Sequence, residues 1–262
     1  MKVRQSVKNF GFRILRLVGG LLVIYVSMVF YLALTERQNA YPRAITHKEA
    51  QDAIQGKAKP LSCTLEDGIT LEGWAIGNAE DPVLLYYPDA NEDAAQFLAE
   101  VQGLPGLDLV SFNLRGSGNN KGTPSTDNFI PDARQIAECA GQLNGNKPKF
   151  LAGRGTGAIL AAEQYGENQS LVLIDPFLSI ADAISEKYRI LYPKFLVRAK
   201  EKIPESSINH HPKGVFLLFD SLRSRDRNHN AEVKFPHIWK RNRYNSTLRE
   251  SLEKIVLQAQ TQ

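Results

Sequence analysis

Sulfur-containing residues are scarce in this chain, whose 262 residues include only two cysteines and two methionines. Cys63 and Cys139 form no C-x-x-C pair and have no metal-ligand spacing, which argues against a zinc site. We expect two buried thiols. A disulfide between them, in an oxidising compartment, is an alternative that the sequence does not decide, because it does not give the distance between the two cysteines. The chain also has no internal repeat and no low-complexity tract. We predict no metal and no cofactor.

The excess of positive charge is small, with 32 basic and 28 acidic residues and a net charge of +4. The basic residues concentrate at the N-terminus and after Arg223, without the interleaved aromatic residues that stack on bases. We therefore expect a solvated, mildly basic surface and no nucleic-acid partner. The length and the ordinary composition, 43% hydrophobic and 23% charged, predict one main domain with an appendage.

The longest apolar stretch lies near the N-terminus, where residues 17–34 form a run of 18 uncharged, mostly apolar residues. A helix of about this length crosses the hydrocarbon layer. The basic residues nearby are Lys2, Arg4, Lys8, Arg13 and Arg16 before the run, and Arg37, Arg43 and Lys48 after it. This bias predicts a single-pass anchor with a cytoplasmic N-terminus and a periplasmic or lumenal globular domain. A cleaved signal peptide is the alternative, although its apolar region is typically shorter, about 7–15 residues.

The pattern of apolar runs divides the chain into four parts. They are a basic cytoplasmic N-terminus (1–16), the transmembrane anchor (17–34), a linker with a short helix (35–59) and a globular domain (60–262). Within the globular domain a hairpin is expected over 61–76, and buried strands over 82–87, 107–112, 149–152, 170–174 and 214–219. Helices are expected near 93–102, 132–143 and 158–165. This alternation predicts an α/β fold with a mostly parallel sheet covered on both faces.

Residues 153–157 have the form G-x-S-x-G, except that a glycine stands in place of the serine. They read Gly153-Arg154-Gly155-Thr156-Gly157, between a short apolar run and a stretch of good helix formers. In such a strand-to-helix elbow the outer glycines permit a tight turn, and the strained central residue exposes its hydroxyl. Gly155 can adopt this geometry but has no oxygen to attack a substrate. The glycine spacing fits neither a dinucleotide-binding loop nor a Walker motif.

Two further loops carry motifs in a family-specific order. Residues 113–124 read Asn-Leu-Arg-Gly-Ser-Gly-Asn-Asn-Lys-Gly-Thr-Pro, and residues 175–180 read Asp-Pro-Phe-Leu-Ser-Ile. The first is similar to an R-G-x-G-x-S-x-G loop with Asn120 in place of its serine, and the second to a P-F-x-S segment. With the elbow, they resemble the α/β-hydrolase fold, specifically the membrane-anchored bud-emergence-like branch near the serine aminopeptidases. The resemblance covers about residues 60–220 and implies an α/β-hydrolase fold.

The resemblance also implies an oxyanion hole, of which one donor comes from an H-G-N-like loop after the first parallel strand. Here residues 87–91 read Tyr-Pro-Asp-Ala-Asn, so Asp89 and Ala90 stand at that loop, and a carboxylate there would repel developing negative charge. The second donor would be the N–H of Thr156, directly after the missing nucleophile. The Thr156 hydroxyl itself is not expected to attack, because a shift of one position points it away from the apex.

The resemblance further implies an acid and a histidine late in the chain. Asp220 or Asp226 would be the acid, since each follows the apolar run that ends at Phe219. His237 precedes the terminal helix that the Thr247-x-x-Glu250 capping box predicts, although it follows Asp226 too closely for a helix and a strand between them. His229 is the other candidate, and a structural role remains the simpler interpretation of each histidine.

A serine triad acts as a unit, so the missing hydroxyl predicts a membrane-tethered pseudohydrolase that binds a protein partner or a small-molecule ligand in the vestigial site. One alternative is an active esterase or peptidase with a displaced nucleophile, for which Ser117, Ser125 and Ser179 are candidates with simpler interpretations as turn residues. Another alternative is a membrane assembly factor that uses the basic tail Lys240-Arg241-Asn242-Arg243. Whether the chain is an enzyme stays open.

Overall fold

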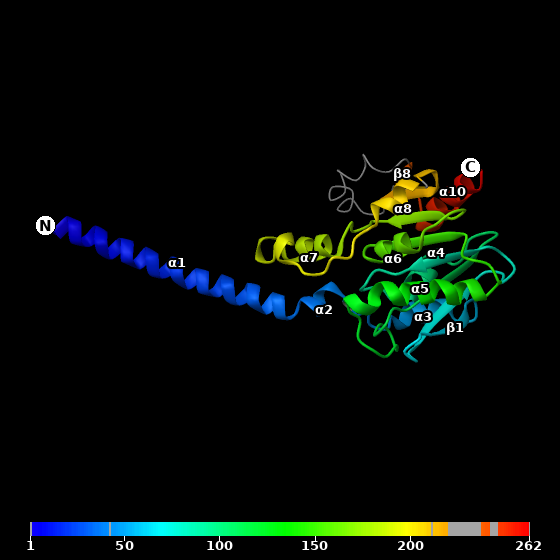
Figure 1. The fold of residues 1–262 in the computed structure, drawn as a ribbon, viewed down its shortest axis with the longest axis horizontal. Helices are drawn as coiled ribbons and strands as arrows, with labels where there is room; N and C mark the ends of the chain where they lie inside the picture. The colour runs from blue at the N-terminus through cyan, green and yellow to red at the C-terminus, as the bar shows by residue number, and fades with distance from the viewer. Residues whose placement is uncertain (1, 42, 211, 220–236, 242–245, 262) are drawn as a thin grey trace.

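The computed structural model describes residues 2–41, 43–210, 212–219, 237–241 and 246–261. At the centre of this part lies an eight-stranded sheet with the spatial order β1-β2-β4-β3-β5-β6-β7-β8 (Figure 1). Strand β2 runs antiparallel to both of its neighbours, and all other pairs are parallel. The strands are β1 (Lys59–Thr64), β2 (Thr70–Ile76), β3 (Val83–Tyr87), β4 (Asp108–Phe112), β5 (Phe150–Arg154), β6 (Ser170–Ile174), β7 (Val215–Phe219) and β8 (His237–Lys240).

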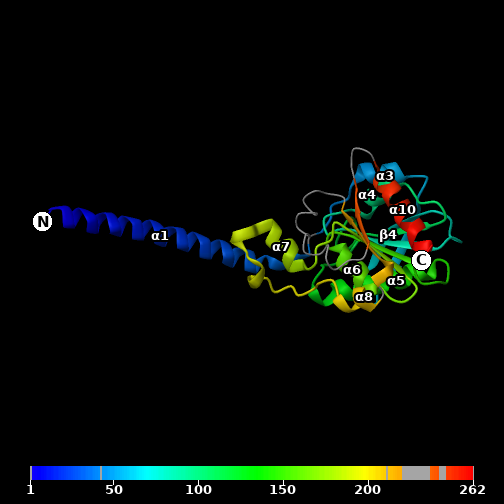
Figure 2. The same cartoon turned by 90° about the horizontal axis from the view of Figure 1, so that it is seen from above.

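Helices cover both faces of the sheet (Figure 2). On one face α3 (Lys48–Ile54), α4 (Ala94–Val101) and α10 (Leu248–Gln260) bury one apolar cluster against the strands. On the other face α5 (Thr126–Gln142), α6 (Gly157–Gln164) and α8 (Glu205–His210) bury a second cluster. Strands β3, β4 and β7 are buried along their whole length, as continuous apolar runs between two helical layers require. The predicted mostly parallel sheet with helices on both faces is confirmed.

Local signals set most of the helix boundaries. Asp93 and Thr247 each begin a helix with a reciprocal capping box, and the second of these was predicted from the sequence. Helix α5 differs from the prediction. It was expected to start at residue 132, after Pro131, but it begins at Thr126 and includes Pro131. A proline removes one backbone donor, and here the rest of the helix tolerates that loss because its apolar face packs on the sheet.

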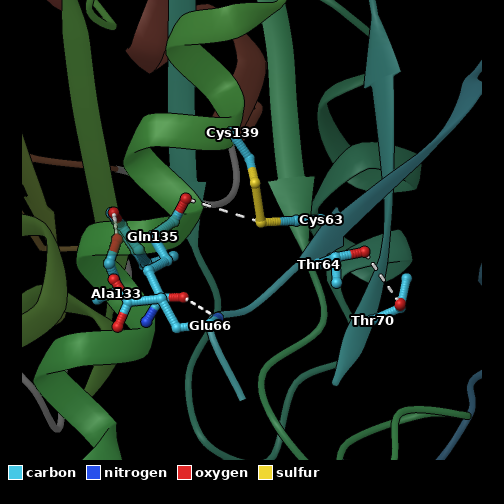
Figure 3. The surroundings of a disulfide bond; sticks show 8 residues. Cys63, Thr64, Glu66, Thr70, Ala133, Gln135 and Cys139 are labelled. Atoms are coloured by element: carbon cyan, nitrogen blue, oxygen red, sulfur yellow. Dashed lines mark hydrogen bonds between the residues drawn. A yellow bond between two sulfur atoms is a disulfide. The ribbon is translucent and has the colours of Figure 1, made fainter. Parts of the chain in front are cut away.

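A disulfide joins β1 to α5. The bond links Cys63 and Cys139, whose Cα atoms lie 5.8 Å apart (Figure 3). The expectation of two buried free thiols is therefore wrong, and the disulfide that the sequence left open is present. Strand β1 lies at the edge of the sheet and contacts α5. The short distance between the two cysteines could not be predicted from their separation along the chain.

Helix α1 (Lys2–Leu34) projects away from the globular part (Figures 1 and 2). Its segment Phe10–Leu34 is long and apolar enough to span a membrane. A signal sequence near an N-terminus would meet the same criteria. Helix α2 (Glu36–Ala40) follows directly. The ends of α1 and α2 contact a segment that was not predicted, the cap segment (residues 177–204), which comprises α7 (Ile180–Tyr188), η1 (Arg189–Leu191) and η2 (Lys194–Leu196).

Candidate functional site: an elbow occupied by a carboxylate

The elbow lies at the carboxyl end of β5, near the centre of the sheet. Gly155 has a φ of +57°, a left-handed conformation that other residues adopt only with strain. The neighbouring glycines are required by close backbone approach. A Cβ on Gly153 would lie 2.3 Å from the Gly157 carbonyl oxygen, and one on Gly157 would lie 2.3 Å from the Tyr87 carbonyl oxygen. The backbone thus forms a strand, a tight turn and the start of α6, the geometry that displays a nucleophile in hydrolases.

The Asp89 carboxylate occupies this elbow. Its Oδ1 accepts hydrogen bonds from the Thr156 backbone N–H at 2.8 Å and from the Ala90 backbone N–H at 2.9 Å. The Thr156 hydroxyl also donates to Oδ1 at 2.7 Å and accepts from the Ala90 N–H at 3.1 Å. One carboxylate oxygen therefore takes three donors, of which two are backbone groups: the Thr156 N–H, expected from the sequence as an oxyanion donor, and the N–H of Ala90 in the loop after β3.

An oxyanion hole stabilises the negative oxygen of a tetrahedral intermediate with the N–H after the nucleophile and an N–H from the loop after β3. Here the N–H groups of Thr156 and Ala90 stand at the two corresponding positions, and both donate to Asp89 Oδ1. Thr156 is also the N-cap of α6, so the positive end of the helix dipole favours the same charge. The arrangement resembles an oxyanion hole filled by a side chain of the same molecule.

Asp89 also fills the space of the missing nucleophile. A Cβ placed on Gly155 would lie 2.4 Å from both Cγ and Oδ1 of Asp89, which is far closer than van der Waals contact allows. The glycine is therefore required for two independent reasons, its positive φ and the position of the carboxylate. A serine at this position would be accommodated only if Asp89 moved.

An ion-pair network surrounds the elbow on the α4 side. Arg154 donates to Glu92 Oε1 at 2.7 Å and to Glu100 Oε2 at 3.0 Å, so the side chain of this elbow residue is directed toward α4. Glu92 Oε2 accepts from the Tyr86 hydroxyl at 2.6 Å and from the Asp89 N–H at 3.1 Å. Burial raises the pKa of Glu92, and the Arg154 charge partly offsets that effect. Glu92 thus fixes the loop that carries Asp89, a role not recognised in the sequence, although its position three residues after Asp89 was a signal.

The acid candidates cannot be placed, since Asp220, Asp226 and the alternative histidine His229 lie outside the described residues. His237 is the first residue of β8 and pairs with Phe216 near the start of β7, so it lies toward the amino ends of the strands. Its ring stacks on the Phe216 ring with 5.0 Å between centroids. The elbow lies at the carboxyl ends, and the structure therefore does not bring His237 together with Gly155.

The residue directly after β8, where the resemblance would imply a histidine, is Arg241. Its Nη1 lies 3.5 Å from Glu100 Oε1, so it joins the ion-pair network of Arg154. Residues 241–247 contain no histidine. An arginine cannot act as a general base at ordinary pH, because its guanidinium remains protonated.

The hydroxyls considered as displaced nucleophiles are held by local structure. Ser117 Oγ accepts from the Ala44 N–H at 3.0 Å, and Ser179 Oγ caps α7 by accepting from the Asp182 N–H at 3.0 Å. Ser125 is the N-cap of α5. The Thr156 hydroxyl is bonded to Asp89 as described above. Among the described residues, none of these hydroxyls bonds to a histidine, the base that a serine nucleophile usually needs.

A small cavity lies beside Ala90, in the loop that carries Asp89. This cavity of about 20 Å³, lined by Tyr41, Ala90 and Phe129 among others, is large enough for about one water molecule. The Tyr41 ring comes from the segment after α2, packs on Phe129, and donates its hydroxyl to Glu201 of the cap segment at 2.5 Å. A larger groove of about 1150 Å³ lies at the opposite, amino-terminal edge of the sheet, between Pro82, Lys149 and Gln169. Within the described ranges no group of three His, Cys, Asp or Glu side chains could hold a metal ion.

The loop after β4 is organised by a buried arginine. Arg115 makes a two-point ion pair with Asp132 of α5, at 2.6 and 2.7 Å, and its Nη1 reaches the partly exposed Asp67 at 2.5 Å. Asn120, which replaces the serine of the similar motif, accepts from the Glu72 N–H at 2.8 Å and donates to the Asn113 carbonyl at 2.7 Å. These contacts explain the loop motif as support for the fold.

Comparison with known proteins gives the fold and leaves the activity open. No protein-family model matches the chain. Two uncharacterized proteins of Mycobacterium tuberculosis are similar, one 24% identical over 186 residues (67% of this chain, 66% of that protein) and the other 30% identical over 133 residues (47% of each). The chain thus spans less than two thirds of the length of either relative.

Several solved structures share the arrangement of strands and helices. An alpha-beta hydrolase from Vibrio vulnificus superimposes with a TM-score of 0.62 at 17% identity, over 86% of this chain and 91% of the other. An esterase of Pyrococcus furiosus gives 0.53 at 16% (84% and 95%), and a proline iminopeptidase-related protein of Thermus thermophilus gives 0.53 at 14% (77% and 98%). Identities this low establish the fold alone. The chain has the α/β-hydrolase fold.

Proposed function

We propose that this chain is a membrane-anchored pseudohydrolase that acts by binding a protein partner and not by covalent catalysis. The observation that carries the proposal is the Asp89 carboxylate, which accepts both backbone donors of the oxyanion hole and fills the nucleophile's space at Gly155. Both donors are thus occupied by a side chain of the same protein, where in catalysis they would bond the oxygen that becomes charged in the transition state.

The physical reason is electrostatic as well as steric. An oxyanion hole accelerates a reaction because its donors are free until charge develops, and removing one donor costs about a hundredfold to a thousandfold in rate. At this elbow both donors are already bonded to Asp89 Oδ1. A substrate carbonyl would have to displace Asp89 and then accept charge next to it, in a site that has no serine to attack.

The cavity beside Ala90 is too small to hold a small-molecule ligand. Pockets for small ligands are typically about 300–1,000 Å³, whereas this cavity has about 20 Å³. Tyr41, which lines this cavity, is held in place by the Glu201 carboxylate of the cap segment and by the Phe129 ring. A partner would therefore recognise the outer surface and not the interior of the former active site.

The anchor is part of the same proposal. Helix α1 spans the membrane with the N-terminus in the cytoplasm and the globular domain in the periplasm or a lumen. The charge bias around α1 supports this orientation. The Cys63–Cys139 disulfide supports it independently, because structural disulfides persist mainly in oxidising compartments. The anchor and the Arg115 loop also support membership in the bud-emergence-like branch.

The test of catalysis uses the full chain in detergent micelles. Wild type, Gly155→Ser and Gly155→Ser/Asp89→Ala are treated with a fluorophosphonate probe and assayed with short acyl esters, beside an active serine hydrolase. We expect no labelling or turnover by wild type or by Gly155→Ser alone, since Asp89 blocks the serine. Specific labelling of wild type would overturn the proposal, and the labelled peptide would identify a displaced nucleophile.

A further inference from the structure

The tip of the cap segment, residues 189–196, exposes apolar side chains that a water-facing loop would not carry. Ile190 is 84% exposed and Phe195 is 83% exposed, and Leu191 between them is also exposed. Among the large apolar residues described as exposed after Leu34, three of five fall within this short stretch, the other two being Ile45 and Leu257. Clustered exposed apolar residues indicate an interaction surface.

The position of this tip indicates what covers it. The Tyr25 hydroxyl of α1 donates to the Ile190 carbonyl oxygen at 3.2 Å, and Arg198 Nη2 donates to the Ala33 carbonyl oxygen at 2.6 Å. Val29 and Ala33 of α1 pack against the same apolar cluster as Leu196 of the cap segment. The tip therefore lies alongside the last three turns of α1 (Figure 1).

The depth of the tip in the bilayer can be derived from helix geometry. With a rise of 1.5 Å per residue, Tyr25 lies about 14 Å along the helix axis before Leu34. The hydrocarbon core is about 30 Å thick, so a membrane-spanning α1 places Tyr25 well inside one leaflet, and the Ile190 carbonyl with it. Backbone groups at that depth need protein partners, and Tyr25 supplies one to the carbonyl of Ile190.

The charges around the tip fit the same surroundings. Residues 187–202 include one acidic residue, Glu201, and six basic ones, Lys187, Arg189, Lys194, Arg198, Lys200 and Lys202. Basic side chains beside an apolar surface bury their stems in the membrane interface and place their charges among anionic head groups. A water-facing loop would have no comparable reason to combine apolar exposure with this charge bias.

We infer that the tip of the cap segment inserts into the leaflet of the bilayer on the globular side of α1, so that the domain contacts the membrane at a second place. This inference rests on the membrane anchorage in the proposed function. The occupant of the exposed apolar surface is lipid, since the surface is continuous with the lipid-facing side of α1.

The test measures depth in the full chain reconstituted into vesicles of phosphatidylcholine and phosphatidylglycerol. Both native cysteines are paired, so a single introduced cysteine can be spin-labelled selectively. The variants are Ile190→Cys and Phe195→Cys in the tip, Val23→Cys in α1, and Leu257→Cys on the exposed face of α10 as the aqueous control. Collision rates with oxygen, which concentrates in lipid, and with a water-soluble nickel chelate give the depth of each label.

We expect positions 190 and 195 to match position 23, with preferential access for oxygen, and position 257 to favour the chelate. If position 23 favours oxygen while 190 and 195 behave like 257, the inference is overturned and the anchor stands. Labels at 190 and 195 shielded from both reagents would mean that a protein covers the tip, which also overturns the inference. Chelate access at position 23 would remove the anchor itself, and the inference with it.

Discussion

The carboxylate of Asp89 lies 2.4 Å from the point where a Cβ on Gly155 would stand. The two positions are therefore coupled, because a side chain at 155 and the present position of Asp89 exclude each other. The oxygen that a hydrolase would hold at its oxyanion hole is supplied here by the protein itself. This relation leads to the first prediction.

Gly155→Ala and Asp89→Ala should have non-additive effects on stability. Alanine at 155 is strained by its positive φ, which costs about 1–3 kcal/mol, and it also meets Asp89. In the Asp89→Ala background that collision is absent, so the double variant should be more stable than the sum of the single effects by about 1 kcal/mol or more. Urea unfolding of the four proteins in micelles measures this difference, and purely additive effects would contradict the arrangement.

The two carboxylates that bind Arg115 should contribute unequally. Asp132 is almost fully buried with the guanidinium, whereas the Asp67 side chain is 51% exposed. Asp132→Asn leaves a buried charge poorly compensated and should lower the free energy of unfolding by about 3 kcal/mol, toward the lower end of the range for broken buried pairs. Asp67→Asn is the matched control and should change it little. Equal losses in chemical denaturation would argue against the geometry.

Removing the disulfide should destabilise the domain. The Cys63–Cys139 bond has a sequence separation of 76, and the chain-entropy model assigns a loop of that length about 4.5 kcal/mol at 25 °C. We expect Cys63→Ala/Cys139→Ala, or reduced wild type, to unfold at a markedly lower denaturant concentration. Mass spectrometry with and without reductant checks that the thiols are paired. A domain whose unfolding is insensitive to both treatments would show that the bond is absent or energetically neutral.

Glu36 should make stability depend on acid pH. Burial alone would raise its pKa, but hydrogen bonds from the Tyr192 hydroxyl, the Arg198 and Ala199 backbone N–H groups and the Arg198 side chain outweigh burial and hold the pKa below its usual 4.5. A depressed carboxyl pKa stabilises the folded state above the unfolded-state value, and the contribution is lost as the pH falls through the folded-state value. The difference in melting temperature between wild type and Glu36→Gln should therefore be largest above pH 4.5 and shrink below it. A constant difference across that window would disprove this role.

Much of the fold could be predicted because the strands are short apolar runs buried on both faces. The run at Ser170–Ile174 has the predicted bounds, and the other parallel strands differ by one or two residues at an end. The cap segment could not be predicted, since its helices depend on tertiary contacts with α1 and α2. Strand β8 was missed for a similar reason, because it is short and half-exposed, and its pairing with β7 depends on tertiary contact.

The site was only partly readable from the sequence. The elbow glycines and the unsuitable Asp89 were both identified, since each follows from local turn chemistry and charge. That Asp89 enters the elbow was not identified, because the contact joins distant loops and depends on the direction of one side chain. The sequence predicted that Asp89 would repel a developing oxyanion. In the structure the Asp89 carboxylate itself bonds to the Thr156 and Ala90 N–H groups.

The attachment of α1 has a mechanical consequence. Glu36, the second residue after the end of α1, is held by the Tyr192 hydroxyl and by the backbone N–H groups of Arg198 and Ala199. These hydrogen bonds make the junction between α1 and the globular domain rigid, so a rotation of α1 is passed on to the domain. With α1 in the bilayer, as proposed, a protein that bound this helix and rotated or tilted it would reorient the whole domain. The orientation of the domain's outer surface is therefore set by α1.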